Sequence, residues 1–159
     1  MYLYFLRHGE ALEGAQFHDS ERPLSNLGLR QAAAVGRFLR EHEIHIEHVF
    51  CSPLLRARQT AEAVQREAGS VAAQTTEHLT SSSDPHLILL ELRTLSSEHV
   101  LLIGHEPHLG KTISLLLGIS DRSRVEMKTS SLACVTTAAE PTPGRGTLRW
   151  LLPTGVTLG

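Results

Sequence analysis

The residues best suited to chemistry in this chain are arginines and histidines that directly follow short apolar runs. They fall in three clusters: Arg7-His8-Gly9, Ser52-Pro53 with Arg56, and Gly104-His105. The carboxyl ends of parallel strands meet at one edge of a sheet, where open α/β sheets bind ligands, so we expect the clusters to converge. Guanidinium groups match the oxygens of phosphate bidentately, and an imidazole is a competent nucleophile towards phosphorus. The pattern therefore predicts a pocket for a dianionic group, most simply phosphate.

Several features of these clusters favour phosphoryl transfer. Arg56 is expected in the first turn of a helix, whose partly positive N-terminus is itself an anion site. Nearby arginines oppose a second positive charge and so favour the neutral form of His8, which is the state a nucleophile needs. Gly9 has no Cβ, so the backbone can turn sharply and a ligand can approach closely. Because the arginines supply positive charge, we expect no metal and no other cofactor.

Apolar patterning predicts that strands and helices alternate, which favours an α/β fold with helices covering a largely parallel sheet. Ser25 is the predicted N-cap of the first helix, and Asp84 caps a later helix with Pro85 at its first position. Alternating residues further along predict an antiparallel C-terminal hairpin. The predicted strands are 2–6, 47–51, 71–76, 99–103, 130–138 and 146–152, and the predicted helices are 26–42, 53–68, 84–95 and 107–117.

Length and composition narrow the class of protein. A chain of 159 residues is most simply one domain, 1–159. The formal net charge is −2, without long blocks of one sign, so no nucleic-acid partner is expected. No apolar segment approaches the roughly 20 residues of a membrane helix, and a signal peptide is not predicted. Cys51 and Cys134 are expected to be buried free thiols, which indicates a cytoplasmic protein, and we expect a monomer.

Taken in order, the motifs resemble the histidine phosphatase (phosphoglycerate mutase-like) superfamily. The resemblance runs over residues 1–117 and rests on Arg7-His8-Gly9, Ser52-x-x-x-Arg56-x-x-x-Thr60 and Gly104-His105. Two further motifs are similar to the SixA-type phosphohistidine phosphatases of that superfamily: Arg22-Pro23-Leu24-Ser25-x-x-Gly28 and Gly104-His105-x-Pro107-x-Leu109.

The resemblance implies a three-layer α/β/α sandwich in which His8 is the phosphoacceptor. Arg7, Arg56 and His105 would form the phosphate pocket. The expected partner is a histidine-phosphorylated protein, such as a histidine-containing phosphotransfer domain or a phosphocarrier. The short stretch between Arg56 and His105 leaves little chain for the lid with which a mutase retains its intermediate, which independently favours a protein substrate.

The sequence leaves more than one candidate for the general acid and more than one class of substrate. Position in the superfamily pattern favours Glu77 as the acid that protonates the leaving group, with Asp19 as the alternative. A phosphoramidate leaving group is more basic than an ester oxygen and can arrive already protonated, so the need for an enzymic acid is smaller. The alternatives are a phosphatase of a small phosphorylated metabolite, a non-catalytic phosphohistidine-binding module and, with its lid missing, a mutase.

Three polar residues near the motifs have structural interpretations. Ser52 is interpreted as a cap at a helix start, and Thr60 as a side chain on the helix face. Arg22 could contact substrate or form a salt bridge within its loop. The histidines at 42, 45 and 48 do not have the i, i+4 spacing of a zinc protease helix, so they predict no metal site.

Overall fold

The computed structural model describes residues 1–122 and 124–157, so parts of the predicted domain 1–159 lie outside the described residues. It shows an α/β fold built on a mixed six-stranded sheet of order β3-β2-β4-β1-β5-β6. The strands are β1 (Tyr2–Arg7), β2 (His48–Cys51), β3 (Gln74–Thr75), β4 (His99–Gly104), β5 (Leu132–Thr136) and β6 (Thr147–Leu152). The helices are α1 (Asn26–Glu41), α2 (Leu55–Ala68), α3 (Pro85–Leu92), α4 (His108–Leu117) and α5 (Thr154–Thr157), with 3-10 turns η1 (Asp19–Glu21) and η2 (Glu77–Leu79).

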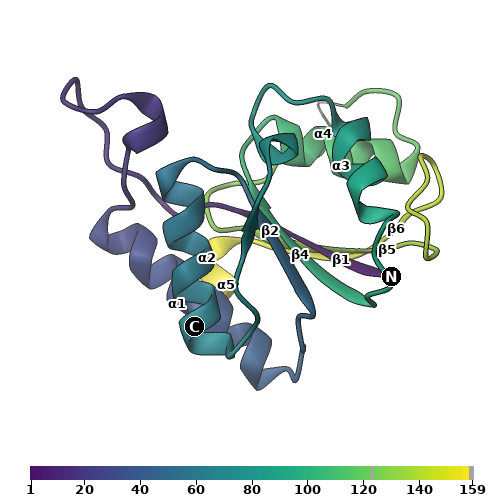
Figure 1. Cartoon of the computed structure of the whole chain (residues 1–159), viewed down its shortest axis with the longest axis horizontal. Coiled ribbons are helices and arrows are strands. Elements are labelled where there is room, and N and C mark those ends of the chain that lie inside the picture. The colour runs from purple at the N-terminus through teal and green to yellow at the C-terminus, as the bar shows by residue number, and fades with distance from the viewer. Residues whose placement is uncertain (123, 158–159) are drawn as a thin grey trace.

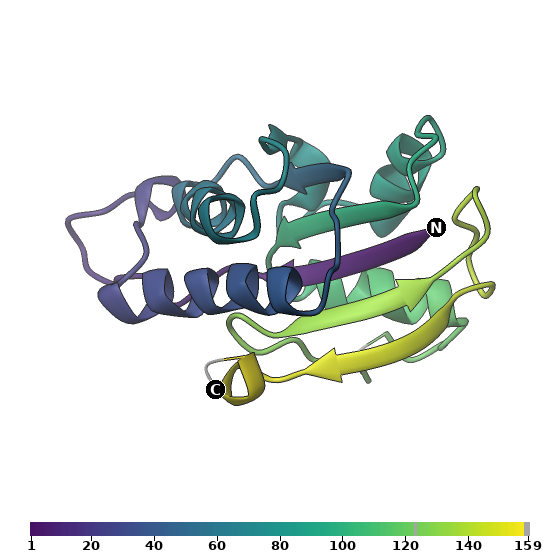
Figure 2. The same ribbon diagram turned by 90° about the horizontal axis from the view of Figure 1, so that it is seen from below.

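Helices cover both faces of the sheet, which confirms the predicted three-layer sandwich (Figures 1 and 2). β1 shows why, because successive side chains of a strand point to opposite faces. Leu3 and Phe5 join the core formed with α3 and α4, whereas Tyr4 and Leu6 join the core formed with α1 and α2. A strand that is buried on both faces in this way reads in sequence as a continuous apolar run.

The strand directions follow the prediction as well. β1, β2, β3 and β4 pair in parallel, whereas β5 pairs antiparallel with β1 and β6 pairs antiparallel with β5. The carboxyl ends of β1, β2 and β4 therefore lie at the same edge of the sheet, which is where the three polar clusters follow.

Local signals set the ends of the helices. The Ser25 hydroxyl accepts the Gly28 N–H at 3.0 Å and caps α1. The Asp84 carboxylate accepts the His86 N–H at 3.0 Å, with Pro85 at the first position of α3. Gly69 ends α2 in the left-handed conformation, with φ of 68°. The predicted caps of α1 and α3 and the predicted end of α2 at residue 68 are confirmed.

Other predicted boundaries were wrong. The strand predicted at 71–76 is only Gln74–Thr75, an exposed pair at the sheet edge, where little apolar burial stabilises a longer strand. The helix predicted from Pro53 begins at Leu55, because Leu54 is extended, with ψ of 140°. The helix predicted to reach Leu95 ends at Leu92, and the first hairpin strand is shorter than 130–138.

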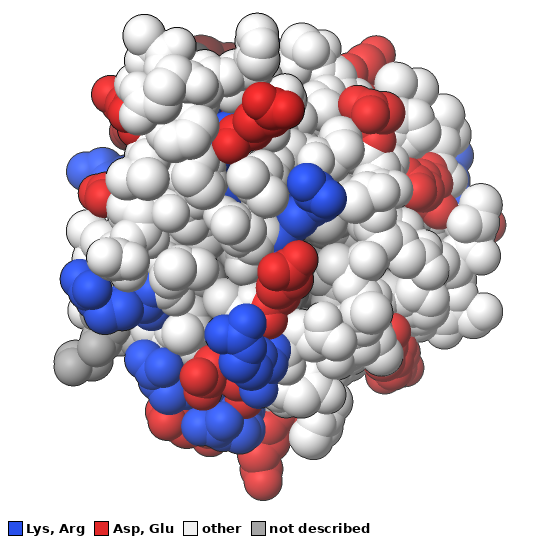
Figure 3. Space-filling view, turned by 60° about the vertical axis from the view of Figure 1, so that its left-hand side comes forward, with Lys and Arg blue, Asp and Glu red and all other residues white. Residues whose placement is uncertain are grey.

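The surface carries both signs of charge in close proximity. Figure 3 shows blue and red side chains interspersed on one face, with the densest mixed cluster at its lower edge. Ion pairs of Arg37 and Arg40 with Glu67 join α1 to α2. Cys51 and Cys134 are free and buried, as predicted, and burial raises the pKa of each thiol to about 11. Within the described part of the chain, no helix is both long enough and apolar enough to span a membrane.

Candidate active site

Side chains from three strand ends meet above the sheet edge. The ring centroids of His8, which follows β1, and His105, which follows β4, are 4.9 Å apart. Arg56, in the first turn of α2, places its Nε 3.4 Å from Nε2 of His8. Residues that are 48 and 97 positions apart in sequence thus share one site, because the parallel register aligns the strands that precede them.

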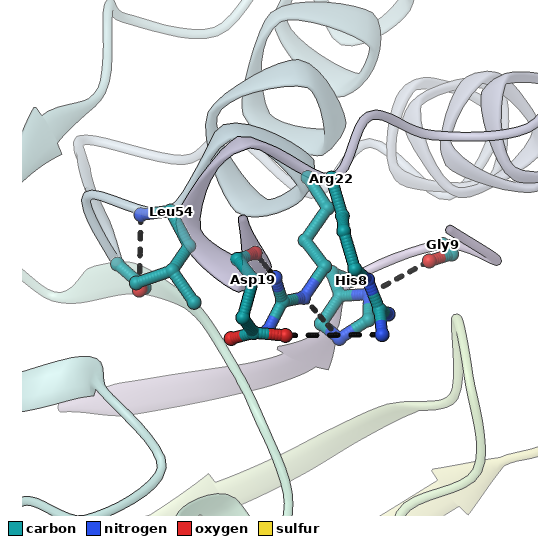
Figure 4. A network of polar contacts seen from close by, with 7 residues as sticks. His8, Gly9, Asp19, Arg22 and Leu54 are labelled. Carbon is teal, nitrogen blue, oxygen red and sulfur yellow. Dashed lines mark hydrogen bonds and ion pairs between the residues drawn. The ribbon is translucent and has the colours of Figure 1, made fainter. Parts of the chain in front are cut away.

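His8 is held as a neutral imidazole whose Nε2 is unprotonated and accepts the Arg56 Nε–H at 3.4 Å. Its Nδ1 lies 2.7 Å from the Gly9 carbonyl, so the protonated Nδ1 donates there and Nε2 keeps its lone pair (Figure 4). Burial first, then the charges of Arg56, Arg7 and Arg22, lower the pKa of His8 from 6.5 to about 4, against the opposite effect of the Gly9 carbonyl. The side chain therefore meets the requirement of a nucleophile at neutral pH.

His105 is a second buried imidazole with unused hydrogen-bonding capacity. Neither of its ring nitrogens has a hydrogen-bond partner among the described residues, although the side chain is buried. Burial first, then the neighbouring His8 and the charges of Arg56 and Arg7, lower its pKa to about 3. Buried polar atoms are normally satisfied, so an oxygen-rich ligand beside His8 is a chemically suitable partner for this ring.

Arg7 contributes a half-buried guanidinium to the same group. Its Nη1 donates to the Met127 carbonyl at 2.9 Å, and its buried Nε has no protein partner among the described residues. Arg7 directly precedes His8 and pairs with Gly104, the residue before His105, so its charge helps to lower the pKa of both histidines. The structure thus brings together His8, Arg7, Arg56 and His105.

Of the two candidate acids, the structure brings only Asp19 to the site. Arg56 Nη2 lies 3.2 Å from Asp19 Oδ2, and Arg56 Nη1 donates to the Asp19 carbonyl at 2.6 Å. Arg22 Nη1 lies 3.7 Å from Asp19 Oδ1, so Arg22 forms a loop ion pair, and Figure 4 also shows its guanidinium beside His8. Glu77 is exposed on η2, and in the described part of the chain only its main-chain carbonyl makes hydrogen bonds, with Thr80.

Thr60 links two of the motifs. Its Oγ1 accepts the Gly9 N–H at 3.1 Å and donates to the Arg56 carbonyl at 2.7 Å, which ties the turn after β1 to α2. Gly9 itself packs against α1, because a Cβ there would lie 2.5 Å from the Gly28 carbonyl oxygen. Ser52 accepts from the Leu54 N–H at 3.4 Å, just before the first turn of α2 rather than within it.

The sequence did not predict that the segment before β5 forms hydrogen bonds with Arg7 and His8. Ser130, with φ of 57°, donates its N–H to the carbonyls of both residues at 3.1 Å. The Met127 carbonyl on the same segment accepts from Arg7. The loop between α4 and β5 has no apolar periodicity, and its contacts are made by main-chain atoms that any residue supplies. No sequence signal could have found them.

A buried neutral imidazole, flanked by guanidinium groups at the carboxyl edge of a parallel sheet, defines a phosphate-handling α/β protein. The chain belongs to the histidine phosphatase superfamily (branch 1), whose family model matches residues 3–81. Phosphohistidine phosphatase SixA of Escherichia coli (strain K12) is 32% identical over 159 residues, covering 94% of this chain and 92% of that protein.

Solved structures agree with this placement. The protein histidine phosphatase SixA complexed with tungstate superposes with a TM-score of 0.88 and 30% identity, covering 98% of this chain and 99% of that structure. A second relative, fructose-2,6-bisphosphatase TIGAR of Xenopus laevis, is 38% identical over 89 residues, 54% of this chain and 30% of its own length. The chain resembles SixA over nearly its whole length and TIGAR only over part of it.

Proposed function

We propose that this protein is a phosphohistidine phosphatase that removes phosphate from a histidine-phosphorylated signalling or phosphocarrier protein in the cytoplasm. The observation that carries the proposal is the state of His8. Its imidazole is neutral, its unprotonated Nε2 accepts only a long hydrogen bond of 3.4 Å from Arg56 Nε among the described residues, and guanidinium groups lie beside it. That combination suits attack on a phosphoryl group whose negative charge the arginines stabilise.

The first step transfers the phosphoryl group to the enzyme. Nε2 of His8 attacks phosphorus, a new N–P bond forms, and the P–N bond to the substrate imidazole breaks with its electron pair returning to that nitrogen. Arg7, Arg56 and His105 bind the equatorial oxygens, where the transferring group carries its charge. The second step is attack by water on phospho-His8, which releases inorganic phosphate and restores the neutral imidazole.

The environment of the two candidate acids supports a phosphoramidate substrate. Asp19 is ion-paired with Arg56 and Arg22, so two guanidinium groups already engage its carboxylate oxygens. The exposed Glu77 carboxylate forms no hydrogen bond or ion pair with the site residues that the structure describes. An alkoxide leaving group needs a proton from an acid, whereas a departing imidazole can already carry one on its second nitrogen. The site therefore favours a phosphohistidine over a phosphate ester.

The comparisons support the same substrate class. The relative that this chain matches over nearly its full length is named a phosphohistidine phosphatase, and the SixA structure that superposes well holds tungstate, a tetrahedral oxyanion like phosphate. TIGAR, named for a small phosphorylated metabolite, matches over a smaller share of both chains. A metabolite phosphatase that uses the same pocket is the second candidate.

The test is phosphate release from a histidine-phosphorylated phosphotransfer domain, without added metal, by the wild type and by His8→Ala. We expect rapid release by the wild type and a loss of at least about 1,000-fold in the variant. His86→Ala, which removes an exposed histidine on α3, is the matched control and should keep full activity. An acid-labile phosphoenzyme should form in the wild type but not in His8→Ala.

Three outcomes would contradict the proposal. Full turnover by His8→Ala would show that His8 is not the nucleophile. If the protein hydrolysed fructose-2,6-bisphosphate but not the phosphoprotein, its substrate would be a small phosphorylated metabolite. Saturable phosphate binding with no release from any substrate would indicate a binding module.

A further inference from the structure

The tautomer of His8 depends on the direction of one main-chain carbonyl. Nδ1 of His8 lies 2.7 Å from the Gly9 carbonyl oxygen, and Figure 4 marks this hydrogen bond between the two residues. In a neutral imidazole the nitrogen that faces an acceptor carries the proton, so this carbonyl keeps Nε2 unprotonated. The contact on the other side of the ring, from Arg56 Nε at 3.4 Å, is longer than an ordinary hydrogen bond and constrains the proton less.

Gln31 binds the other end of the same peptide group. The carbonyl of Gly9 and the N–H of Glu10 belong to one planar, trans peptide unit, so they point in opposite directions and turn together. The Glu10 N–H donates to Gln31 Oε1 at 2.8 Å. In the part of the chain that the structure describes, this peptide group makes no hydrogen bonds other than those to His8 and Gln31. Gln31 therefore fixes the plane that presents the carbonyl to His8.

The position of Gln31 is set by the packing of α1 against the turn after β1. Gln31 lies in the second turn of α1, and its side chain is buried. A Cβ at Gly28 would lie 2.0 Å from the Glu10 carbonyl oxygen, so the first turn of α1 lies directly against this residue. The same carbonyl accepts the Ser25 N–H at 2.9 Å. The start of α1 thus holds the Gln31 oxygen within reach of the peptide group.

The peptide group after Gly9 needs such a partner, because a glycine without a Cβ lets the adjoining peptide rotate more freely than other residues do. The peptide group before Gly9 has its own partners. The Gly9 N–H donates to Thr60 Oγ1 at 3.1 Å, and the His8 carbonyl accepts the Ser130 N–H at 3.1 Å. The two peptide groups that flank Gly9 are therefore held by different residues, and Gln31 holds the one that contacts the His8 ring.

We propose that Gln31 is a positioning residue for His8, acting through the peptide group between Gly9 and Glu10 to keep Nδ1 protonated and Nε2 available for attack. Without the Gln31 oxygen, the peptide group turns, the Gly9 carbonyl leaves Nδ1, and the proton moves to Nε2, where it blocks attack. This inference rests on the proposed function only in taking His8 as the nucleophile.

The experiment measures the tautomer of His8 by ¹⁵N NMR, because protonated and unprotonated imidazole nitrogens have well-separated shifts. The wild type and Gln31→Met are compared at pH 7, and the His8 signals are identified by their loss in His8→Ala. Methionine has nearly the length of glutamine but no acceptor for the Glu10 N–H. We expect Nδ1 to carry the proton in the wild type, and both tautomers to be populated in Gln31→Met.

The chemical consequence is measured with phosphoramidate, a small phosphoryl donor that needs no protein partner. Nε2 of His8 forms the new N–P bond, the P–N bond of the donor breaks, and ammonia leaves. We expect phospho-His8 to form about tenfold more slowly in Gln31→Met than in the wild type.

Gln59→Met is the matched control. Gln59 Oε1 accepts the Leu24 N–H at 2.7 Å, so this variant loses the same kind of hydrogen bond at a peptide group that does not contact His8. Unfolding temperatures should fall in both variants, whereas the tautomer and the rate of phosphorylation should change only in Gln31→Met. If Gln31→Met fails to fold, Gln31→Ala, which also removes the acceptor and favours the helix, takes its place.

An unchanged His8 tautomer in the Gln31 variant, or an equal change in Gln59→Met, would overturn the inference. A changed tautomer with an unchanged rate would also overturn it, since the position of the proton would then not govern attack. If the tautomer and the rate depend on Gln31 but the phosphoprotein is not hydrolysed, the proposed function fails and the role of Gln31 stands. If the phosphoprotein is hydrolysed and the tautomer does not depend on Gln31, the reverse holds.

Discussion

Lowering the pH should destabilise this protein steeply, because three buried histidines are neutral in the folded state. Burial is the largest cause of the lowered pKa of each, to about 4 for His8, about 3 for His105 and about 4 for His108. In the unfolded chain each titrates near a pKa of about 6.5. Between the two values the unfolded state binds a proton that the folded state does not, so stability falls as the pH falls below about 6.5.

The size of the effect follows from these values. A difference of one in pKa corresponds to about 1.4 kcal/mol, so each histidine should cost about 2 kcal/mol of stability at pH 5 relative to pH 7. Together the three amount to about 6 kcal/mol, comparable with the whole stability of many domains. His108 allows the clearest test because it is fully buried, and neither of its ring nitrogens has a hydrogen-bond partner among the described residues.

The assay is urea unfolding at pH 7 and pH 5, followed by the fluorescence of Trp150. His108→Leu removes the titrating group and leaves an apolar side chain at a buried position, so its stability should depend on pH by about 2 kcal/mol less than that of the wild type. His45→Gln, at an exposed position, is the control and should match the wild type. If His108→Leu loses as much stability between the two pH values as the wild type does, the burial argument is refuted.

Three further substitutions test the surroundings of the site. Asp19→Ala removes a carboxylate that competes with phosphate for the arginines, so phosphate affinity measured by calorimetry should rise by up to about fivefold; a fall would mean that Asp19 supports binding. Thr60→Val leaves the Gly9 N–H without its acceptor and should cost about 1–3 kcal/mol in urea unfolding, with a parallel loss of phosphatase activity. Gly28→Ala places a Cβ 2.0 Å from the Glu10 carbonyl oxygen and should lower the unfolding temperature by several degrees; an unchanged value would contradict the close packing.

The parts of the fold that sequence predicted well are those with a local cause. The apolar run of β1 indicated burial on both faces, and Ser25, Asp84 and Gly69 marked helix ends by the chemistry of their own side chains or backbone. β3 was overestimated because its length depends on pairing at the sheet edge rather than on its own residues.

The candidate site divides in the same way. His8, Arg7, Arg56 and His105 could be named from sequence because each follows a recognisable strand. The Asp19–Arg56 ion pair depends on how the intervening loop folds back, so the sequence did not reveal it. The choice between Glu77 and Asp19 as general acid stays a prediction. The contacts of Met127 and Ser130 are made by main-chain atoms, which carry no residue signature.

The place of β1 in the sheet has a consequence for how the site is made during synthesis. β1 lies between β4 and β5, with Tyr2 paired to His99 and Leu6 to Leu132. The strand that leads into His8 is therefore translated long before β4 and β5. Until both are made, β1 has no strand to pair with and its apolar side chains stay exposed. A nascent chain that ends before β5 lacks the neighbouring strand on one side of β1, so the site around His8 is incomplete. Phosphatase activity should consequently arise late and all at once, and the waiting strand is the segment that a chaperone would have most reason to shield.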